Sequence, residues 1–240
     1  MKKFLFSSFL MASAIFISCS SMKVDDEKNS LSMELKCNDI TKENFNQLAP
    51  VFKACCVLNT AAFAEVESQN PIYKFLTKQA SKTIEELLEK GWENITMKKV
   101  RTNLQSAQPQ PCYLIYQKLN DALIAFALVY IKSSECYREE LKQDKDIQKI
   151  DFTFKPAGYQ SGQEVYIDTL AVDPKFQGID IGTGLIMAIK ANIPSTKHLY
   201  LEVGARNEKA QGFYAKLGFK QQGLIKAKAE ANFIYSLFLQ

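Results

Sequence analysis

The chain has 240 residues, of which 47% are hydrophobic and 23% charged, enough apolar side chains for one sizeable core. Its formal net charge is +4, to which Lys2 and Lys3 contribute, and no basic block alternates with aromatic residues. This balance argues against a nucleic-acid-binding surface, so we expect no nucleic-acid partner.

The first 18 residues have the composition of a signal peptide. Lys2 and Lys3 precede an uncharged run, Phe4–Ile17, which is shorter than a membrane-spanning helix requires. The run ends close to Cys19 and resembles the lipobox of bacterial lipoproteins, in which the cysteine becomes the lipidated first residue. The resemblance implies a lipoprotein anchored to a membrane of the bacterial envelope through Cys19, with a polar tether over residues 19–30. An apolar N-terminal helix in a cytoplasmic protein is the alternative.

The rest of the chain, residues 31–240, is expected to form one domain of alternating strands and helices. Hydrophobic patterning predicts a strand at Met33–Asn38, a helix from Thr41 to about Phe63, a helix at Ile72–Leu88, and strands at Cys112–Gln117 and Ala122–Ile131. The turn Leu119-Asn120-Asp121 joins the last two strands into a hairpin.

Residues 132–163 form a long, highly charged connection without clear periodicity. Segments of this length are usually functional or mobile. We interpret this one either as a lid or substrate loop or as a solvated insertion.

The stretch after this connection is predicted to carry a strand into a tight loop and then a helix. The strand is Tyr166–Val172, and the helix is Leu185–Asn192. Between them lie three glycines, Gly178, Gly182 and Gly184. Because backbone N–H groups at a helix N-terminus bind anions, the loop is a candidate cradle for a diphosphate.

The C-terminal part completes a recognisable pattern. A buried strand at Leu199–Val203 precedes a helix at Lys209–Leu217, and a last strand is expected at Phe233–Leu239. The region resembles the GNAT superfamily of acyl-CoA-dependent N-acyltransferases. The matching pieces are Leu170-Ala171-Val172, a Gln-x-x-Gly-x-Gly-type loop from Gln177, Asn207, and Phe213-Tyr214 before Leu217-Gly218-Phe219. The resemblance implies an α/β GNAT fold, a mixed central β-sheet flanked by helices with a splayed strand pair that holds acyl-CoA.

The resemblance also implies roles for individual residues. The backbone at Leu170 and Val172 would pair with the pantetheine arm of acetyl-CoA, Asn207 would bond the same arm, and Tyr214 would protonate the departing sulfur. The loop amides that would hold the diphosphate are those of Gln177, Gly178, Ile179, Asp180, Ile181, Gly182 and Thr183. Asn207 could equally cap the following helix, and Tyr214 could be a core aromatic.

One loop position departs from the family pattern, because Asp180 stands where a glycine is usual. Aspartate tolerates left-handed backbone angles, so the turn can form. Its carboxylate beside a diphosphate would cost on the order of 1 kcal/mol of cofactor affinity.

The general base is not fixed by the sequence. Asp168 is expected to share the face of Tyr166 and Leu170, because side chains alternate along a strand, and could accept a proton through water. Glu164 and Glu202 are rival candidates. A carboxylate on a central strand is expected to be paired or functional.

Histidine and cysteine supply no competing chemistry. Five cysteines besides Cys19 (Cys37, Cys55, Cys56, Cys112 and Cys136) show neither zinc-ligand spacing nor a disulfide framework, although export would permit one or two bridges. Cys55 and Cys56 are interpreted as buried thiols and the single histidine, His198, as structural; no metal site is expected.

The resemblance thus implies an N-acetyltransferase that moves an acetyl group from acetyl-CoA to a primary amine of a small molecule, peptide or protein. A non-catalytic, lipid-anchored module with the same fold is the main alternative, because acetyl-CoA is cytoplasmic whereas a lipobox directs export. A secreted factor that reaches a foreign cytoplasm is the third interpretation.

Overall fold

A computed structural model of the chain describes residues 22–23, 32–68, 83, 96–152, 163–193, 196–228 and 230–239. The expected signal peptide and most of the expected tether lie outside these ranges. So does the expected helix Ile72–Leu88, apart from Thr83. Within the described residues, no helix is both long and apolar enough to span a bilayer.

The described strands form one mixed sheet, which confirms the expected α/β class. The strand order is β1-β2-β3-β4-β6-β7-β9-β8-β5. Within it β6 and β7 are parallel, and the other described neighbours are antiparallel. The strands are β1 (Met22–Lys23), β2 (Ser32–Asp39), β3 (Cys112–Leu119), β4 (Ala122–Ile131), β5 (Ile147–Phe152), β6 (Glu164–Val172), β7 (His198–Gly204), β8 (Lys220–Ala227) and β9 (Ala231–Phe238).

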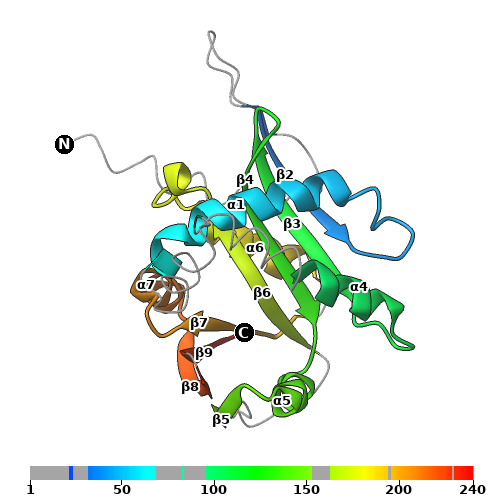
Figure 1. Cartoon of the computed structure of the whole chain (residues 1–240). Helices are drawn as coiled ribbons and strands as arrows, with labels where there is room; N and C mark the ends of the chain where they lie inside the picture. The colour runs from blue at the N-terminus through cyan, green and yellow to red at the C-terminus, as the bar shows by residue number, and fades with distance from the viewer. Residues whose placement is uncertain are drawn as a thin grey trace, which may run out of the picture.

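Helices pack against both faces of the sheet (Figure 1). One face carries α1, α4 and α5, and the opposite face carries α6 and α7. Their bounds are α1 (Ala49–Ser68), α4 (Lys98–Gln105), α5 (Ser134–Gln143), α6 (Ile181–Asn192) and α7 (Glu208–Lys216), with a short 3-10 helix, η3 (Pro174–Phe176), between β6 and α6.

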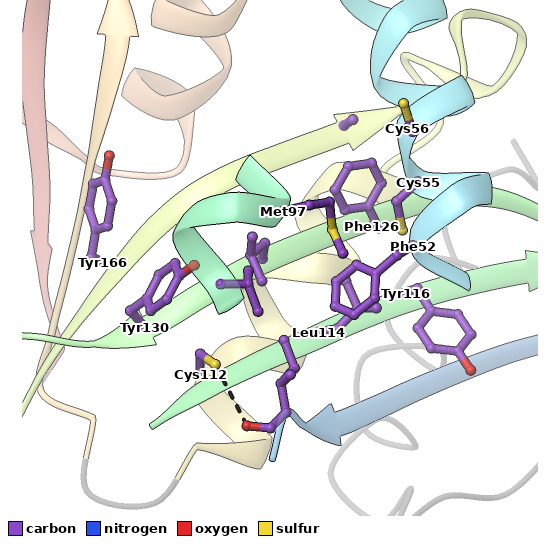
Figure 2. Close-up of a cluster of buried hydrophobic side chains, with 14 of the residues drawn as sticks. Phe52, Cys55, Cys56, Met97, Cys112, Leu114, Tyr116, Phe126, Tyr130 and Tyr166 are labelled. Carbon is purple, nitrogen blue, oxygen red and sulfur yellow. Dashed lines mark hydrogen bonds between the residues drawn. The ribbon is translucent and has the colours of Figure 1, made fainter. Parts of the chain in front are cut away.

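The central strand β4 divides two apolar cores. Phe126 and Leu128 pack in the core with Phe52 of α1 on one face, and Figure 2 shows Phe126 beside Phe52. Val129 packs with Leu185 of α6 on the other face. A strand covered on both faces needs apolar side chains at nearly every position. This explains why β4 is a continuous apolar run rather than an alternating one.

The predicted hairpin and first strand are confirmed. β3 and β4 pair antiparallel, and the turn residues Asn120 and Asp121 have φ angles of 48° and 64°. Two consecutive positive φ angles are typical of a type I′ hairpin turn, which suits asparagine and aspartate. The predicted strand Met33–Asn38 lies within β2.

The first helix begins later than predicted. Thr41 and Asn44 bond each other's backbone N–H groups, as a capping pair would. The residues that follow form turns, however, and the regular helix α1 begins at Ala49. Pro50 favours this start because proline suits the first helical turn, where its missing N–H costs nothing.

The charged connection of residues 132–163 contains more regular structure than its sequence indicates. Its described part forms α5, capped by the Ser133 hydroxyl, which accepts from Cys136 N at 3.1 Å. It then forms β5, an edge strand on β8. Residues 153–162 lie outside the described residues.

The cysteines are thiols in the described structure. Cys55 and Cys56 are buried in the core beneath α1, as predicted, and burial raises the pKa of Cys55. Burial also raises the pKa of Cys112 to about 11. The Cys55 and Cys112 thiols therefore stay protonated and unreactive at neutral pH.

Candidate active site

The candidate site lies where β6 and β7 separate. Their parallel pairing runs from Glu164–Ile167 of β6 against His198–Leu201 of β7 and then stops. β6 continues to Val172 beside β4, and β7 continues to Gly204 beside β9. The two parallel strands are therefore splayed at their carboxyl ends, as expected.

A β-bulge in β6 lies at the point of separation. The register between β4 and β6 shifts between Leu128 and Val129, where Thr169 and Ile167 are the partners and Asp168 has none on β4. A bulge re-aims the side chains that follow it. Tyr166 therefore packs on the face of the sheet that carries α4 and α5, whereas Leu170 packs against the core of α6. The prediction that Tyr166 and Leu170 share one face is wrong, because alternation is broken at Asp168.

A cleft of about 1380 Å³ opens in this splay. It is bounded by β6, β7, the loop into α6, α7 and the middle of α1. All the expected site residues except Ile179, whose side chain is exposed, line it. The side chains and backbone that sequence reasoning placed together are thus brought together, and the contribution of α1 through Asn59 and residues 61–64 is an addition.

The loop before α6 presents a row of backbone N–H groups. Among the described residues no hydrogen-bond acceptor occupies the N–H groups of residues 178–183. Intrahelical bonding leaves the first N–H groups of a helix without partners, and the helix dipole adds positive potential there. This loop can hold an anionic group such as a diphosphate.

Asp180 adopts the conformation that a glycine would have there. Its φ is 63° and its ψ 9°, in the left-handed region, as predicted. The side chain makes no capping bond to the helix, and its Oδ1 accepts only a long bond of 3.5 Å from Thr183 Oγ1. The carboxylate is exposed at the cradle, so its charge acts on any anion bound there.

Gly182 and Gln177 connect the loop to its neighbours in different ways. A Cβ on Gly182 would lie 3.0 Å from Cζ of Phe213, so the glycine lets α6 approach α7. The Gln177 amide donates to the Val172 carbonyl at 3.0 Å. The Val172 carbonyl is expected to pair with the pantetheine arm, and it already accepts this one hydrogen bond from the chain itself.

Tyr214 and Asn207 lie on α7 at the other side of the cleft. Asn207 caps α7, since its side chain accepts from Ala210 N at 3.1 Å, and it also lines the cleft. Tyr214 packs against Phe219 with ring centroids 5.3 Å apart and is 7% exposed. Burial raises the pKa of its phenol, so Tyr214 is a neutral proton donor at physiological pH.

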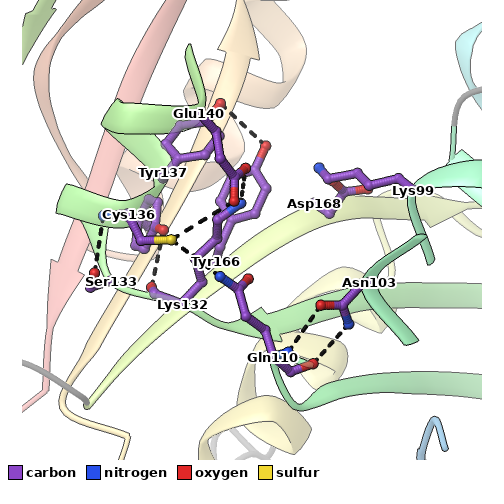
Figure 3. Close-up of polar contacts among 11 residues, drawn as sticks. Lys99, Asn103, Gln110, Lys132, Ser133, Cys136, Tyr137, Glu140, Tyr166 and Asp168 are labelled. Atoms are coloured by element: carbon purple, nitrogen blue, oxygen red, sulfur yellow. Dashed lines mark hydrogen bonds and ion pairs between the residues drawn. The ribbon is translucent and has the colours of Figure 1, made fainter. Parts of the chain in front are cut away.

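Asp168 is paired with a lysine that the sequence did not indicate. Lys99 of α4 forms an ion pair with the Asp168 carboxylate (Figure 3), and the carboxylate also accepts from Thr169 Oγ1. The Lys99 ammonium lies 5.4 Å and 5.2 Å from the ring centroids of Tyr130 and Tyr166. Sequence reasoning missed Lys99 because its helix is short and the pair spans 69 residues.

Glu202 is the cleft carboxylate with an altered proton affinity. It lies on β7 where the strands part, and its Oε2 accepts from Asn232 Nδ2 at 3.0 Å. Burial raises its pKa from 4.5 to about 7, an effect that the bond from Asn232 and the charge of Lys99 partly offset. Glu202 can therefore both accept and release a proton near neutral pH.

The third carboxylate candidate, Glu164, lies at the opposite end of β6. It is buried, accepts from Ser134 N at 2.9 Å and lies 3.1 Å from His198 Nδ1. It does not line the cleft. Glu164 and His198 therefore join β6, β7 and the start of α5, which is consistent with a structural histidine.

The residues of the cleft fit a coenzyme A thioester. The anion cradle lies at the mouth, the splay leaves an edge of β6 accessible to an extended arm, and a carboxylate and a phenol flank the same cavity. These features together define a transferase that uses an acyl thioester.

Comparison with known proteins agrees with this class. Residues 79–219, more than half of the chain, match the family model described as the acetyltransferase (GNAT) family. The chain belongs to this family, whose members transfer acetyl groups from acetyl-CoA. A comparison with curated protein sequences found no significant match.

One solved structure shares the fold at low identity. The PaiA N-acetyltransferase of Thermoplasma acidophilum, in complex with coenzyme A, is 12% identical with a TM-score of 0.52, covering 86% of this chain and 99% of that one. The ribosomal-protein-S18-alanine N-acetyltransferase of Escherichia coli is 15% identical with a TM-score of 0.47, covering 86% and 94%.

Proposed function

We propose that the chain is an N-acetyltransferase that moves the acetyl group of acetyl-CoA to a primary amine of a small molecule, peptide or protein. The observation that carries this proposal is the cleft in the β6–β7 splay, which has an anion cradle at one end and Glu202 and Tyr214 in its walls. Bound acetyl-CoA supplies an acyl carbon activated as a thioester.

The cradle and the splayed strand hold the acyl donor. The N–H groups of residues 178–183 bind the diphosphate, and the free edge of β6 at residues 168–172 bonds the extended arm as an added strand would. Fixing the donor in this way aligns the acyl carbon with the incoming amine, and such alignment is a large part of the rate enhancement of many enzymes.

Glu202 and Tyr214 transfer the protons. An ammonium cannot attack a carbonyl carbon, so Glu202 accepts a proton from the acceptor. Tyr214 gives its phenolic proton to the departing sulfur and recovers one from solvent. We assign the base to Glu202 rather than to Asp168, because Asp168 is held in an ion pair with Lys99 whereas the pKa of Glu202 lies near neutral pH.

Substitution of Tyr214 by phenylalanine tests the proton donor. We expect turnover, measured as coenzyme A thiol released with a panel of primary amines, to fall by roughly 100-fold. The Kd for acetyl-CoA by calorimetry should change less than about threefold, because the ring remains in its packing site. Phe219→Tyr in the adjacent ring is the matched control, and unchanged turnover in Tyr214→Phe would remove Tyr214 from the mechanism.

A lipid-anchored module without catalysis is a second candidate, favoured by the Asp180 carboxylate at the cradle. On this view Cys19 carries the lipid and the domain binds a ligand or partner at a membrane of the bacterial envelope. Calorimetry with acetyl-CoA separates the two candidates. Micromolar binding by the natural chain supports the enzyme, and binding that appears only after Asp180→Gly supports the module.

A further inference from the structure

Lys99 does not itself line the cleft, but it holds its amine against a carboxylate that does. Its Nζ is bonded to Asp168, and Asp168 lines the cleft at the bulge where β6 leaves β7. Lys99 approaches from α4, on the face of the sheet opposite α6 and its cradle. A donor whose diphosphate lies at the N-terminus of α6 would thus meet Lys99 from the other side.

The surroundings of Lys99 recognise an ammonium group. The carboxylate of Asp168, 10% exposed, and the faces of Tyr130 and Tyr166 surround the Nζ, an arrangement that stabilises cations. The hydroxyl of Tyr130 is buried, and no described residue bonds it. The Lys99 side chain as a whole remains 37% exposed.

Glu202 is a candidate base for this amine. Glu202 lies on the neighbouring strand at the same point of the splay, and the charge of Lys99 lowers the Glu202 pKa. Amine, base and cleft are therefore within electrostatic reach of one another. Within the described residues, Lys98 is exposed on the same helix but has no carboxylate of the cleft wall beside it, and the Lys132 side chain, ion-paired with Glu140, is only 3% exposed against 37% for Lys99.

We propose that Lys99 is an acceptor of this enzyme in its own right, acetylated within the same chain by the bound acetyl-CoA. This inference rests on the proposed function. Lys99 gives one proton to Glu202, its Nζ forms a C–N bond to the acyl carbon, and the C–S bond breaks. Tyr214 protonates the sulfur and its phenolate recovers a proton from solvent, while the nitrogen loses its second proton to solvent and Glu202 releases the first. In sum, an ammonium and a thioester become an Nε-acetyl amide, a free thiol and one proton released to solvent.

Acetylation would change the site that it occurs in. An acetylated lysine carries no charge, so the ion pair with Asp168 and the attraction to the Tyr130 and Tyr166 rings are lost. The Asp168 carboxylate then becomes available to the ammonium group of an external acceptor.

The experiment incubates the full chain with acetyl-CoA and follows acetylation of each lysine by peptide mass spectrometry. We expect Lys99 to be acetylated at least about 100-fold faster than Lys98 or Lys132, because alignment and a general base act on Lys99 alone. Lys98→Arg should leave the rate at Lys99 unchanged. Glu202→Gln and Tyr214→Phe, two independent variants, should each slow it, by roughly 100-fold and by roughly 10-fold or more respectively.

Mixing distinguishes reaction within one chain from reaction between chains. An isotope-labelled Glu202→Gln chain is mixed with the unlabelled natural chain, and only the unlabelled Lys99 should gain the acetyl group. Acetylation of the labelled chain at the same rate would overturn the intramolecular step.

Calorimetry and thiol release in the same preparation test the proposed function separately from the acetylation of Lys99. Acetyl-CoA that binds and is turned over with free amines while Lys99 stays unmodified overturns the Lys99 assignment and leaves the proposed function intact. Absence of both binding and turnover overturns the proposed function.

Discussion

Asp168 on β6 and Glu202 on β7 are two carboxylates of the same cleft with different environments. Asp168 forms an ion pair with Lys99. Glu202 instead accepts a hydrogen bond from the side-chain amide of Asn232 and is affected by the charge of Lys99 without forming an ion pair with it. An opposite charge favours the ionised form of a carboxyl group and burial disfavours it, so the two groups have different roles. Asp168 binds positive charge, and Glu202 exchanges protons.

The pH dependence of turnover should report Glu202. We expect kcat/KM to fall below a pH of about 7, because the protonated carboxyl cannot accept a proton from the acceptor. Glu202→Gln should lower turnover by roughly 100-fold and remove this limb of the profile. Rates measured across the neutral range check it, with Glu139→Gln, an exposed carboxylate on α5, as the matched control. A limb that persists in Glu202→Gln belongs to another group.

The charge of Asp180 can be separated from its backbone conformation. Asp180→Asn removes the charge and keeps a residue that tolerates a positive φ, so we expect the Kd for acetyl-CoA to fall by about fivefold, the equivalent of about 1 kcal/mol. Asp180→Ala also removes the charge but strains the left-handed position by about 1–2 kcal/mol. Calorimetry at low and high salt compares the variants, and the gain in Asp180→Asn should shrink at high salt. Equal Kd values for the natural chain and the Asp180→Asn variant at low salt would show that the carboxylate points away from the anion.

At the scale of elements, the splay depends on β6 being held on one side and released on the other. Its pairing with β4 continues past the bulge, whereas its pairing with β7 ends at Ile167. The loop, η3 and α6 then follow without interruption, so the free strand edge and the anion cradle are built by one continuous segment. Their relative position is therefore fixed by local geometry, which suits the binding of one long ligand.

The insertion strand β5 should be separable from the cleft. A Cβ on Gly223 of β8 would lie 1.9 Å from the Asp151 carbonyl oxygen, so Gly223→Ala cannot keep the present β5–β8 contact. We expect a loss of about 2–3 kcal/mol in the free energy of unfolding and faster hydrogen exchange in β5. Acetyl-CoA binding should persist, because none of these residues lines the cleft.

Gly184→Ala on α6 is the matched control for stability, since no atom lies within 4 Å of the added Cβ and alanine favours a helix by about 1 kcal/mol. Urea unfolding measures the free energy of unfolding of both variants, and calorimetry measures their binding of acetyl-CoA. Loss of acetyl-CoA binding in Gly223→Ala would mean that β5 supports the cleft after all.

Local signals in the sequence predicted most of the site but not its charged neighbours. The hairpin turn, the left-handed Asp180 and the capping Asn207 follow from properties of single residues, and the structure has all three. The short helix α4 and the strands β5 and β8 were not predicted, because their apolar positions are few and their burial depends on distant partners. The bulge at Asp168 was equally hidden, since it arises from pairing with β4 rather than from the strand itself.

At the scale of the whole molecule, Glu202 makes stability depend on pH. Its pKa is raised from 4.5 to about 7 by burial, so the folded chain holds a proton that the unfolded chain releases between these values. The stabilising effect of that proton is complete below pH 4.5 and is lost as pH rises through about 7, a decrease on the order of 3 kcal/mol. We therefore expect the free energy of unfolding, measured by urea titration across this pH range, to fall more steeply in the natural chain than in Glu202→Gln, whose amide is neutral throughout. Saturating acetyl-CoA should raise the free energy of unfolding of both chains at every pH, because the cleft binds it only when folded. If the free energies of the two chains fall in parallel with pH, the Glu202 pKa lies near its ordinary value and the role of base returns to Asp168.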